Sequence, residues 1–381
     1  MATTGSTGQR PSRKRCLRME SLLQLPHEVV EQILEKLAVK SLLRFKAVSK
    51  QWRSTIESQF FQGRHLTHRQ RSGDPDVLMV SEQAYPGTDT LTTLVLGSSS
   101  SVKIPVPWEE TDNTPYWVFH SSCDVLCLFN RYKFFVVNPA TRWYRALPPC
   151  SFQQLYYHSL GYGYFTPGFG KDVFSSTYKP VWLYNSLELG LENATTCQVF
   201  DFTTNAWRYV TPAAPYRVLA PVNPVFVDGS LHWLTHCQET KVVSFDLHTE
   251  AFQVISNAPF VKSPHRNGMF MCNLHNRLCV SVMKRPQQVI WSFNSNNKTW
   301  DKMYTVDLDL TVVHGIPIFT GYPLVPLAIL KKKKLLFCDR IRMRSRQLFT
   351  RDSETKRDEV AFSGESTGVP VCYFPSLISI L

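Results

Sequence analysis

The sequence predicts an α+β protein in two parts, a small three-helix module followed by a large all-β, propeller-like domain. Apolar residues recur at helical spacing only between residues 21 and 64. Beyond residue 77, short apolar runs alternate with Pro, Gly and Asn as far as the C-terminus, which is typical of strands and turns. One hairpin pattern also recurs in this second region, at the period of propeller blades.

Composition supports a folded chain. Of the 381 residues, 43% are hydrophobic, which is enough to build a sizeable core. The net charge of +12 is concentrated in two segments, residues 1–20 with +4 and residues 331–357 with +8. The rest of the chain is balanced, so we expect no nucleic-acid partner. No stretch of 18 apolar residues occurs, so we expect no membrane span.

The ten cysteines are irregularly spaced, and the N-terminus lacks the apolar core of a secretory signal. We therefore expect reduced, mostly buried thiols in an intracellular protein. Cys123 and Cys127 are four apart, but no second pair of ligands follows at metal-binding spacing. These two cysteines are interpreted as core residues, and we expect neither a metal nor a cofactor.

Residues 1–20 are polar and basic, and we expect a disordered tail. Residues 21–64 are predicted to form three helices, the first after Pro26 and the next two capped by Ser41 and Ser49. Val29, Ile33 and Leu37 are spaced four apart, which predicts one broad apolar face together with Val30 and Leu34.

The run LPHEVVEQILEKLAVKSLLRFKAVSKQWRSTI resembles an F-box. The family's Leu-Pro start matches Leu25-Pro26, and its Val-Cys/Ser-Lys-x-Trp ending matches residues 48–52. Ala38 stands where the family often has Pro, and Ala continues a helix more easily.

The resemblance implies docking on the S-phase-kinase-associated adaptor protein, which bridges to a cullin scaffold. It assigns the docking to apolar residues of the module, some of which must belong to its own core. The candidates are Leu25, Pro26, Val29, Ile33, Leu37, Leu42, Leu43 and Trp52.

Residues 65–76 are predicted to form a polar linker, and residues 77–381 the β domain. Four runs in this domain share one pattern: a strand, then Asn or Asp, a Thr or Asn three residues later, and an aromatic after three more. The copies are Asn138/Thr141/Tyr144, Asp201/Thr204/Trp207, Asp246/Thr249/Phe252 and Asn294/Asn297/Trp300, with a degenerate fifth at Asp352/Thr355.

Asn or Asp at the end of a strand opens a turn, and the aromatic then packs beneath that turn. About 300 residues at this period predict six or seven blades. Because propellers often close by pairing terminal strands, we expect residues 369–374 to pair with 76–80. Trp207 and Trp300 are expected in blade cores.

The β region resembles the F-box-associated, kelch-like domain of plant proteins. The matching segments are DVLCLFN and FFVVNPATRWYRALP within 124–147, GYGY at 161–164 before Tyr178-Lys179, and DGSLHWL at 228–234. The glycines at 161–170 lack P-loop spacing and are interpreted as turns between strands.

Arg342, Arg344 and Arg346 alternate in the most basic segment. They are candidates for binding an acidic or phosphorylated substrate, whereas the alternative is a solvated edge that discourages aggregation.

Together these features predict a non-catalytic substrate receptor of a cullin-type ubiquitin ligase, in the cytoplasm or nucleus, that recruits target proteins for degradation. Two alternatives stay open, a kelch-like metal-dependent oxidoreductase and a basic nucleic-acid-binding protein.

Overall fold

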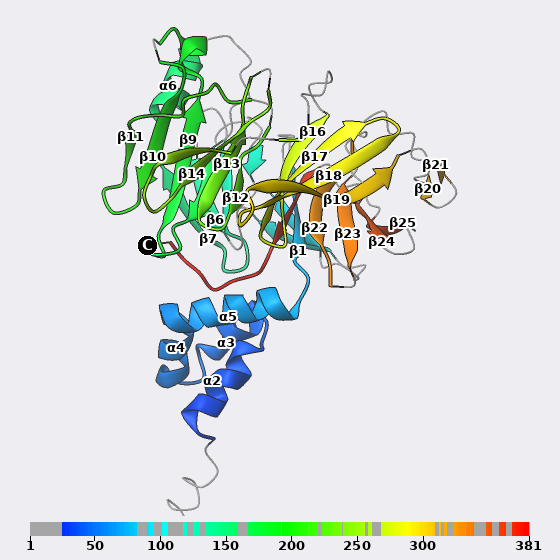
Figure 1. Cartoon of the computed structure of the whole chain (residues 1–381). Coiled ribbons are helices and arrows are strands. Elements are labelled where there is room, and N and C mark those ends of the chain that lie inside the picture. The colour runs from blue at the N-terminus through cyan, green and yellow to red at the C-terminus, as the bar shows by residue number, and fades with distance from the viewer. Residues whose placement is uncertain are drawn as a thin grey trace, which may run out of the picture.

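A helical module and a β-propeller make up the computed structural model of the chain (Figure 1). The structure describes residues 25–81, 90–94, 101–105, 117–119, 125–129, 134–158, 167–191, 193–219, 222–237, 239–255, 258–260, 268–308, 312–313, 316–317, 323–331, 333–338, 348–352, 358–362 and 368–380. The expected basic tail at 1–20 lies outside these residues. No helix among them is long and apolar enough to cross a membrane.

From residue 25 onward, where the structure describes the chain, four helices form the N-terminal module: α2 (His27–Glu35), α3 (Val39–Phe45), α4 (Lys50–Glu57) and α5 (Gln59–Ser72). The predicted cap Ser49 is confirmed, because its hydroxyl accepts a hydrogen bond from the Trp52 amide at 3.1 Å. The prediction for Ser41 is wrong. Extended Ala38 precedes α3 instead, so alanine does not prolong the first helix here.

The expected linker at 65–76 is largely helical, which corrects the sequence prediction. Helix α5 begins after Ser58, whose hydroxyl caps it by accepting from the Phe61 amide at 3.2 Å, and it runs on to Ser72. Phe61, His65 and Leu66 bury one side of this helix in the module core. Its remaining surface is polar, so the sequence lacked a wide apolar stripe. The expected turn at Gly73–Pro75 does separate α5 from the first strand.

Six four-stranded antiparallel sheets are present in the described part of the chain. The first three contain β26 (Gly368–Tyr373), β1 (Asp76–Ser81), β2 (Thr90–Leu94) and β3 (Ser101–Pro105); β4 (Trp117–Phe119), β5 (Leu126–Phe129), β6 (Phe134–Asn138) and β7 (Trp143–Leu147); and β8 (Gly168–Lys171), β9 (Tyr178–Tyr184), β10 (Thr196–Asp201) and β11 (Ala206–Val210).

The other three contain β12 (Val225–Val227), β13 (Ser230–Leu234), β14 (Val242–Asp246) and β15 (Phe252–Ile255); β16 (Met269–Leu274), β17 (Arg277–Lys284), β18 (Gln287–Asn294) and β19 (Thr299–Asp307); and β22 (Val325–Ile329), β23 (Lys334–Cys338), β24 (Leu348–Asp352) and β25 (Asp358–Phe362). Helix α6 (Ser151–His158), the 3-10 turn η1 (Ser186–Leu189) and a small sheet of β20 (Val312–Val313) with β21 (Ile316–Pro317) complete the elements.

The predicted closure of the ring is confirmed. Strand β26 pairs antiparallel with β1 along its whole length, from Asp76 opposite Tyr373 to Ser81 opposite Gly368. The last strand of the chain is therefore the first strand of the first sheet. Neighbouring sheets contact each other through the first strand of each sheet. The contacting pairs are β22 with β26, β26 with β4, β8 with β12, and β12 with β16.

The hairpin pattern is also confirmed. In all four copies the side-chain oxygen of the Asn or Asp accepts a hydrogen bond from the amide two residues later. Four residues after each of them, the backbone is left-handed, with φ between 53° and 59° at Arg142, Asn205, Glu250 and Lys298. These turns join the third and fourth strands of their sheets.

The aromatics of the second, third and fourth copies pack as expected, whereas Tyr144 of the first copy is exposed. Trp207 lies opposite Phe200, and Trp300 lies opposite Phe293, with ring centroids 5.2 Å apart in both pairs. Trp300 is buried, as predicted. Trp207 is only partly buried and packs against the core while its indole donates to the Pro148 carbonyl at 2.7 Å.

Part of the glycine-rich segment at 161–170 is a strand rather than a turn. Gly168 and Gly170 belong to β8, where it crosses the fourth sheet. A β-carbon added to Gly170 would lie 2.2 Å from a ring carbon of Phe226, and one at Gly168 would lie 2.7 Å from Leu231. Glycine here permits close sheet packing.

Most described cysteines are free and buried, as expected. Loss of hydration on burial raises the pKa of Cys150, Cys197 and Cys372 to about 12. A thiol that resists ionisation is a poor metal ligand or nucleophile. Cys16 and Cys123 lie outside the described residues.

Removing residues 366–381 should unfold the whole propeller. Deletion takes away β26, which pairs with β1 and contacts β4 and β22, so the ring loses its closing strand rather than one frayed end. We expect loss of the cooperative thermal transition, measured by circular dichroism. A truncated chain that melts at the parent temperature would contradict closure through β26.

Candidate docking surfaces

Part of the expected docking set forms an exposed apolar row on α2 and the residues just before it. Leu25, Val29 and Ile33 are spaced four apart, so they follow one side of the helix. Their exposed fractions are 58%, 38% and 47%. Pro26 is exposed beside them. Helix α2 lies on the side of the module away from the propeller, so the row is open to a partner (Figure 1).

The other predicted docking residues belong to the module's own core. Leu42 is fully buried there, and Leu37, Leu43 and Trp52 are partly buried against the same cluster. Leu34 and Val30 also face this core, so the single broad apolar face expected for the first helix is two faces. The face with Val30 and Leu34 packs in the module core, and the face with Val29 and Ile33 is exposed to solvent. The spacing of the apolar residues did not predict which face would be buried.

Two exposed apolar side chains were missed as surface candidates. Val48, between α3 and α4, is 59% exposed, and Phe60, at the start of α5, is 72% exposed. Four exposed cations lie within eight residues of Val48 in the sequence: Lys40, Arg44, Lys50 and Arg53.

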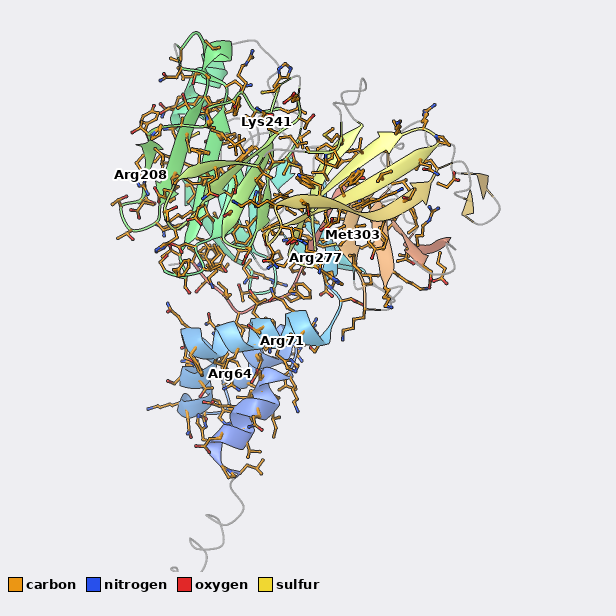
Figure 2. The ribbon with its side chains drawn as sticks, in the orientation of Figure 1. Arg64, Arg71, Arg208, Lys241, Arg277 and Met303 are labelled. Atoms are coloured by element: carbon orange, nitrogen blue, oxygen red, sulfur yellow. The ribbon has the colours of Figure 1, made fainter. Side chains whose placement is uncertain are left out.

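A shallow groove of about 680 Å³ runs beside Phe60 along α5. It is lined by Glu35, Arg64, Thr67, His68 and Arg71 among others, and Figure 2 shows Arg64 and Arg71 along this helix. Arg64 is already paired with Glu35 and, at 3.7 Å, with Glu31. The charge of Arg64 in this groove is therefore balanced by carboxylates of α2.

The propeller has two edges, a near edge that faces the helical module and a far edge that faces away from it. Turns between first and second strands, and between third and fourth strands, share one edge because neighbouring strands run antiparallel. The start of β1 and the end of β26 lie on this edge, so the helical module sits beneath it (Figure 1). The opposite edge, which carries the remaining connections, is turned away from the module.

Exposed apolar side chains gather at the third sheet on this far edge. Helix α6 contributes Leu155, the turn after β9 contributes Leu187 and Leu191, and the end of β11 contributes Tyr209. The Tyr209 hydroxyl donates to Ser151 at 2.9 Å, which ties β11 to the start of α6. Phe152 holds α6 in place by packing 4.9 Å from both Trp182 and Tyr184. We call these four exposed residues the far-edge patch.

Arg342, Arg344 and Arg346 lie outside the described residues. Their segment joins β23 to β24, the second and third strands of the sixth sheet. The strand ends that it connects, Cys338 and Leu348, are at the far edge. The role of these arginines in substrate binding stays a prediction.

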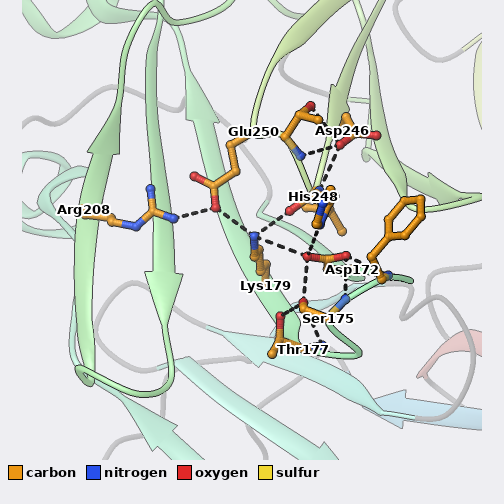
Figure 3. Close-up of polar contacts among 11 residues, drawn as sticks. Asp172, Ser175, Thr177, Lys179, Arg208, Asp246, His248 and Glu250 are labelled. Carbon is orange, nitrogen blue, oxygen red and sulfur yellow. Dashed lines mark hydrogen bonds and ion pairs between the residues drawn. The ribbon is translucent and has the colours of Figure 1, made fainter.

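A cluster of polar side chains lies between the third and fourth sheets (Figure 3). Lys179 pairs with Glu250 at 2.8 Å and lies 3.8 Å from Asp172. Glu250 also accepts from Arg208 at 2.5 Å. The Nδ1 atom of His248 lies 3.2 Å from a carboxylate oxygen of Asp172, and the exposed ring of Phe174 packs against the His248 ring.

This cluster resembles no nucleophilic triad. Ser175 donates to Asp172 at 2.7 Å, and His248 contacts the same carboxylate. A serine nucleophile needs its hydroxyl on the histidine, which then acts as the base. Burial alone would raise the pKa of Asp172, but hydrogen bonds from Ser175, Phe174 and His248 outweigh it and lower the pKa to about 2. A carboxylate with so low a pKa is a weak base. The pairs Lys179–Glu250 and Asp172–His248 connect the third sheet to the fourth, which indicates a structural role for the cluster.

The described part of the chain contains no group of side chains arranged as a metal site. No three His, Cys, Asp or Glu side chains among these residues come together as ligands would. His232 is buried on β13, and loss of hydration lowers its pKa to about 4, so it is neutral at physiological pH.

Comparison with known proteins assigns both parts of the chain. Residues 22–62 match the F-box domain, and residues 90–380 match the F-box associated beta propeller domain. Among curated relatives, the F-box/LRR-repeat/kelch-repeat protein At1g09650 of Arabidopsis thaliana is 60% identical, with 97% of this chain and 99% of the relative covered. The F-box protein At2g34280 of the same plant is 49% identical over 94% and 99% of the two chains.

This chain belongs to the F-box proteins that carry an F-box-associated β-propeller domain. Both resemblances found in the sequence are thereby confirmed. The combination of an F-box with a propeller is typical of substrate receptors of cullin ligases.

Acid should weaken the propeller through Asp172. The folded-state pKa of this carboxyl is about 2, below its usual 3.8, so its contribution is complete above pH 4 and is lost as pH falls toward 2. Asp172→Asn should lower the free energy of unfolding by about 1–3 kcal/mol at pH 7. In urea titrations at several pH values, the difference from wild type should shrink below pH 4.

The matched control is Asp301→Asn, at an exposed carboxyl on β19. It should leave the free energy of unfolding nearly unchanged at every pH. An Asp172→Asn variant as stable as wild type at pH 7 would show that the cluster does not join the sheets.

Proposed function

We propose that this protein is the substrate receptor of a cullin-type ubiquitin ligase. Its F-box binds the S-phase-kinase-associated adaptor, and its propeller captures a target protein for ubiquitination and degradation. The observation that carries the proposal is the exposed row of Leu25, Val29 and Ile33 on α2, in a module whose core is already complete without it. An isolated small domain rarely leaves such a row uncovered.

The arrangement of the two parts supports this function. The apolar row lies on the outer side of the module, and the far edge of the propeller lies on the other side of the molecule (Figure 1). Adaptor and target therefore bind without competing for one surface. The chain itself performs no chemistry in this proposal, because holding a target lysine near the charged conjugating enzyme raises its effective concentration.

The far-edge patch is the proposed place of target capture. Leu155, Leu187, Leu191 and Tyr209 combine aliphatic and aromatic surface at solvent-exposed positions. Such side chains are the usual anchors of protein interfaces. Arg342, Arg344 and Arg346 would add selectivity for acidic targets. A ligase of this kind acts in the cytoplasm or nucleus, and we propose that location.

Replacing Val29 and Ile33 with Asp should abolish adaptor binding while the fold is kept. Both side chains are exposed in the free protein, so the change costs little stability, but docking would bury two unpaired charges. We expect at least a hundredfold loss of affinity for the purified adaptor, measured by calorimetry, with an unchanged melting temperature. Wild-type affinity would refute the docking assignment.

Changing Leu187 and Leu191 to Asp provides the matched opposite. These two residues are also exposed and four apart, but they lie on the far edge of the propeller. Adaptor affinity should be unchanged, whereas proteins that accumulate on the receptor under proteasome inhibition, detected by proximity labelling, should be lost.

The triple change of Arg342, Arg344 and Arg346 to Glu tests the electrostatic part separately. Targets retained by both variants would move the capture surface elsewhere.

A further inference from the structure

The last residues of the chain continue beyond the closing strand and touch both parts of the molecule. After β26, the C-terminal segment passes between α5 and the near edge of the propeller (Figure 1). Leu377 is buried in the core of the F-box, against the cluster that contains Leu34 and Leu42. Ile380 is buried in the propeller core instead, with Ile378 packed beside it. Adjacent residues of one segment therefore anchor two different domains.

One propeller residue binds this segment directly. The side-chain amide of Asn138 donates to the Ser376 carbonyl at 3.1 Å, the Ser376 hydroxyl at 3.1 Å and the Ile378 carbonyl at 2.7 Å. Its oxygen meanwhile accepts from the Ala140 amide at 3.0 Å, which keeps the hairpin turn. The other turns need only the accepting oxygen, and two of them use Asp. Asn138 is also fully buried, whereas its counterparts are partly exposed.

A second connection lies at the other end of α5. The Lys331 amide, in the turn between β22 and β23, donates to Asp74 at 2.8 Å, and its ammonium group contacts the Ser72 carbonyl. This contact holds the chain where it leaves α5. The Asn138 contact belongs to the second sheet and the Lys331 contact to the sixth, so the F-box is held at two separated points.

We propose that residues 374–380 are a strap that fixes the orientation of the F-box against the propeller, with Asn138 and Leu377 as positioning residues. The inference rests on the proposed ligase function for its consequence: a fixed orientation sets the path from the adaptor to the captured target. Without the strap, the described residues would connect the domains through the short segment Gly73–Pro75, the Lys331 contact and the packing of Ala140 against the F-box cluster. Both binding surfaces would persist, but the target lysine would no longer be held at one distance from the conjugating enzyme.

Asn138→Asp is the decisive variant. Aspartate preserves the turn, as Asp201 and Asp246 do in the same position, but it cannot donate to the strap and turns a carboxylate toward two carbonyl oxygens. Asn294→Asp is the control for the turn itself, because it makes the same change in the corresponding, partly exposed turn of the fifth sheet, which has no hydrogen bond to the strap. A chain ending after Pro375 removes Leu377 while keeping β26.

Small-angle X-ray scattering of each full-length variant, bound to the adaptor, tests the orientation. Asn138→Asp and the shortened chain should give a larger radius of gyration and a flexible profile, with a cooperative melting transition of the propeller retained. The shortened chain should melt at a lower temperature, because it also loses Ile380 from the propeller core. Asn294→Asp should match wild type. A wild-type profile from the shortened chain would overturn the strap, and one from Asn138→Asp alone would remove Asn138 from the proposal.

Ubiquitin transfer provides a readout that fold stability does not move. For this assay, a peptide epitope is inserted after Glu239, in the loop between β13 and β14 at the far edge. The reporter is a lysine-rich protein fused to a domain that binds this epitope, so every variant captures the same target at the same place. Asn138→Asp should bind the reporter and the adaptor as wild type does, yet transfer ubiquitin about tenfold more slowly. An unchanged rate would contradict the positioning role. Failure of the wild type to modify the reporter would refute the proposed function, while the scattering result would still decide the strap.

Discussion

The pairing of β26 with β1 is the interaction on which the rest of the structure depends. It joins segments about 290 residues apart, so the chain must close a very long loop before this pairing forms. Each four-stranded sheet is apolar on both faces and is stable only between two neighbours. Because β26 belongs to the first sheet, its pairing with β1 brings the first sheet into contact with the second and the sixth, which would otherwise each lack a neighbour.

Closure also decides where the helical module lies. The start of β1 and the end of β26 meet at one edge of the ring, so α5 and the C-terminal segment must emerge side by side. The near edge is consequently occupied by the F-box, with Leu377 inserted in its core. The far edge remains open, and the surface available to a target is defined by this one pairing.

Local chemistry explains which predictions from sequence were right. The turns at Asn138, Asp201, Asp246 and Asn294 depend on a side-chain oxygen and an amide two residues away, so they can be read without knowledge of the fold. The cap at Ser49 and the aromatic pairs beneath the turns are equally local. Helix α5 was missed because its buried stripe is narrow and contains His65, which looks polar in sequence.

The sequence by itself determined the F-box, the repeated hairpins and the strand that closes the ring, because each is encoded in a short run of residues. Only the tertiary structure decided that Val29 and Ile33 face solvent while Val30 and Leu34 face the core, and that Leu42 is not available to a partner. It alone showed that Asn138 binds the chain terminus more than 230 residues away. Spacing places side chains on a helix or strand, but what covers each face depends on the segments that folding brings against it.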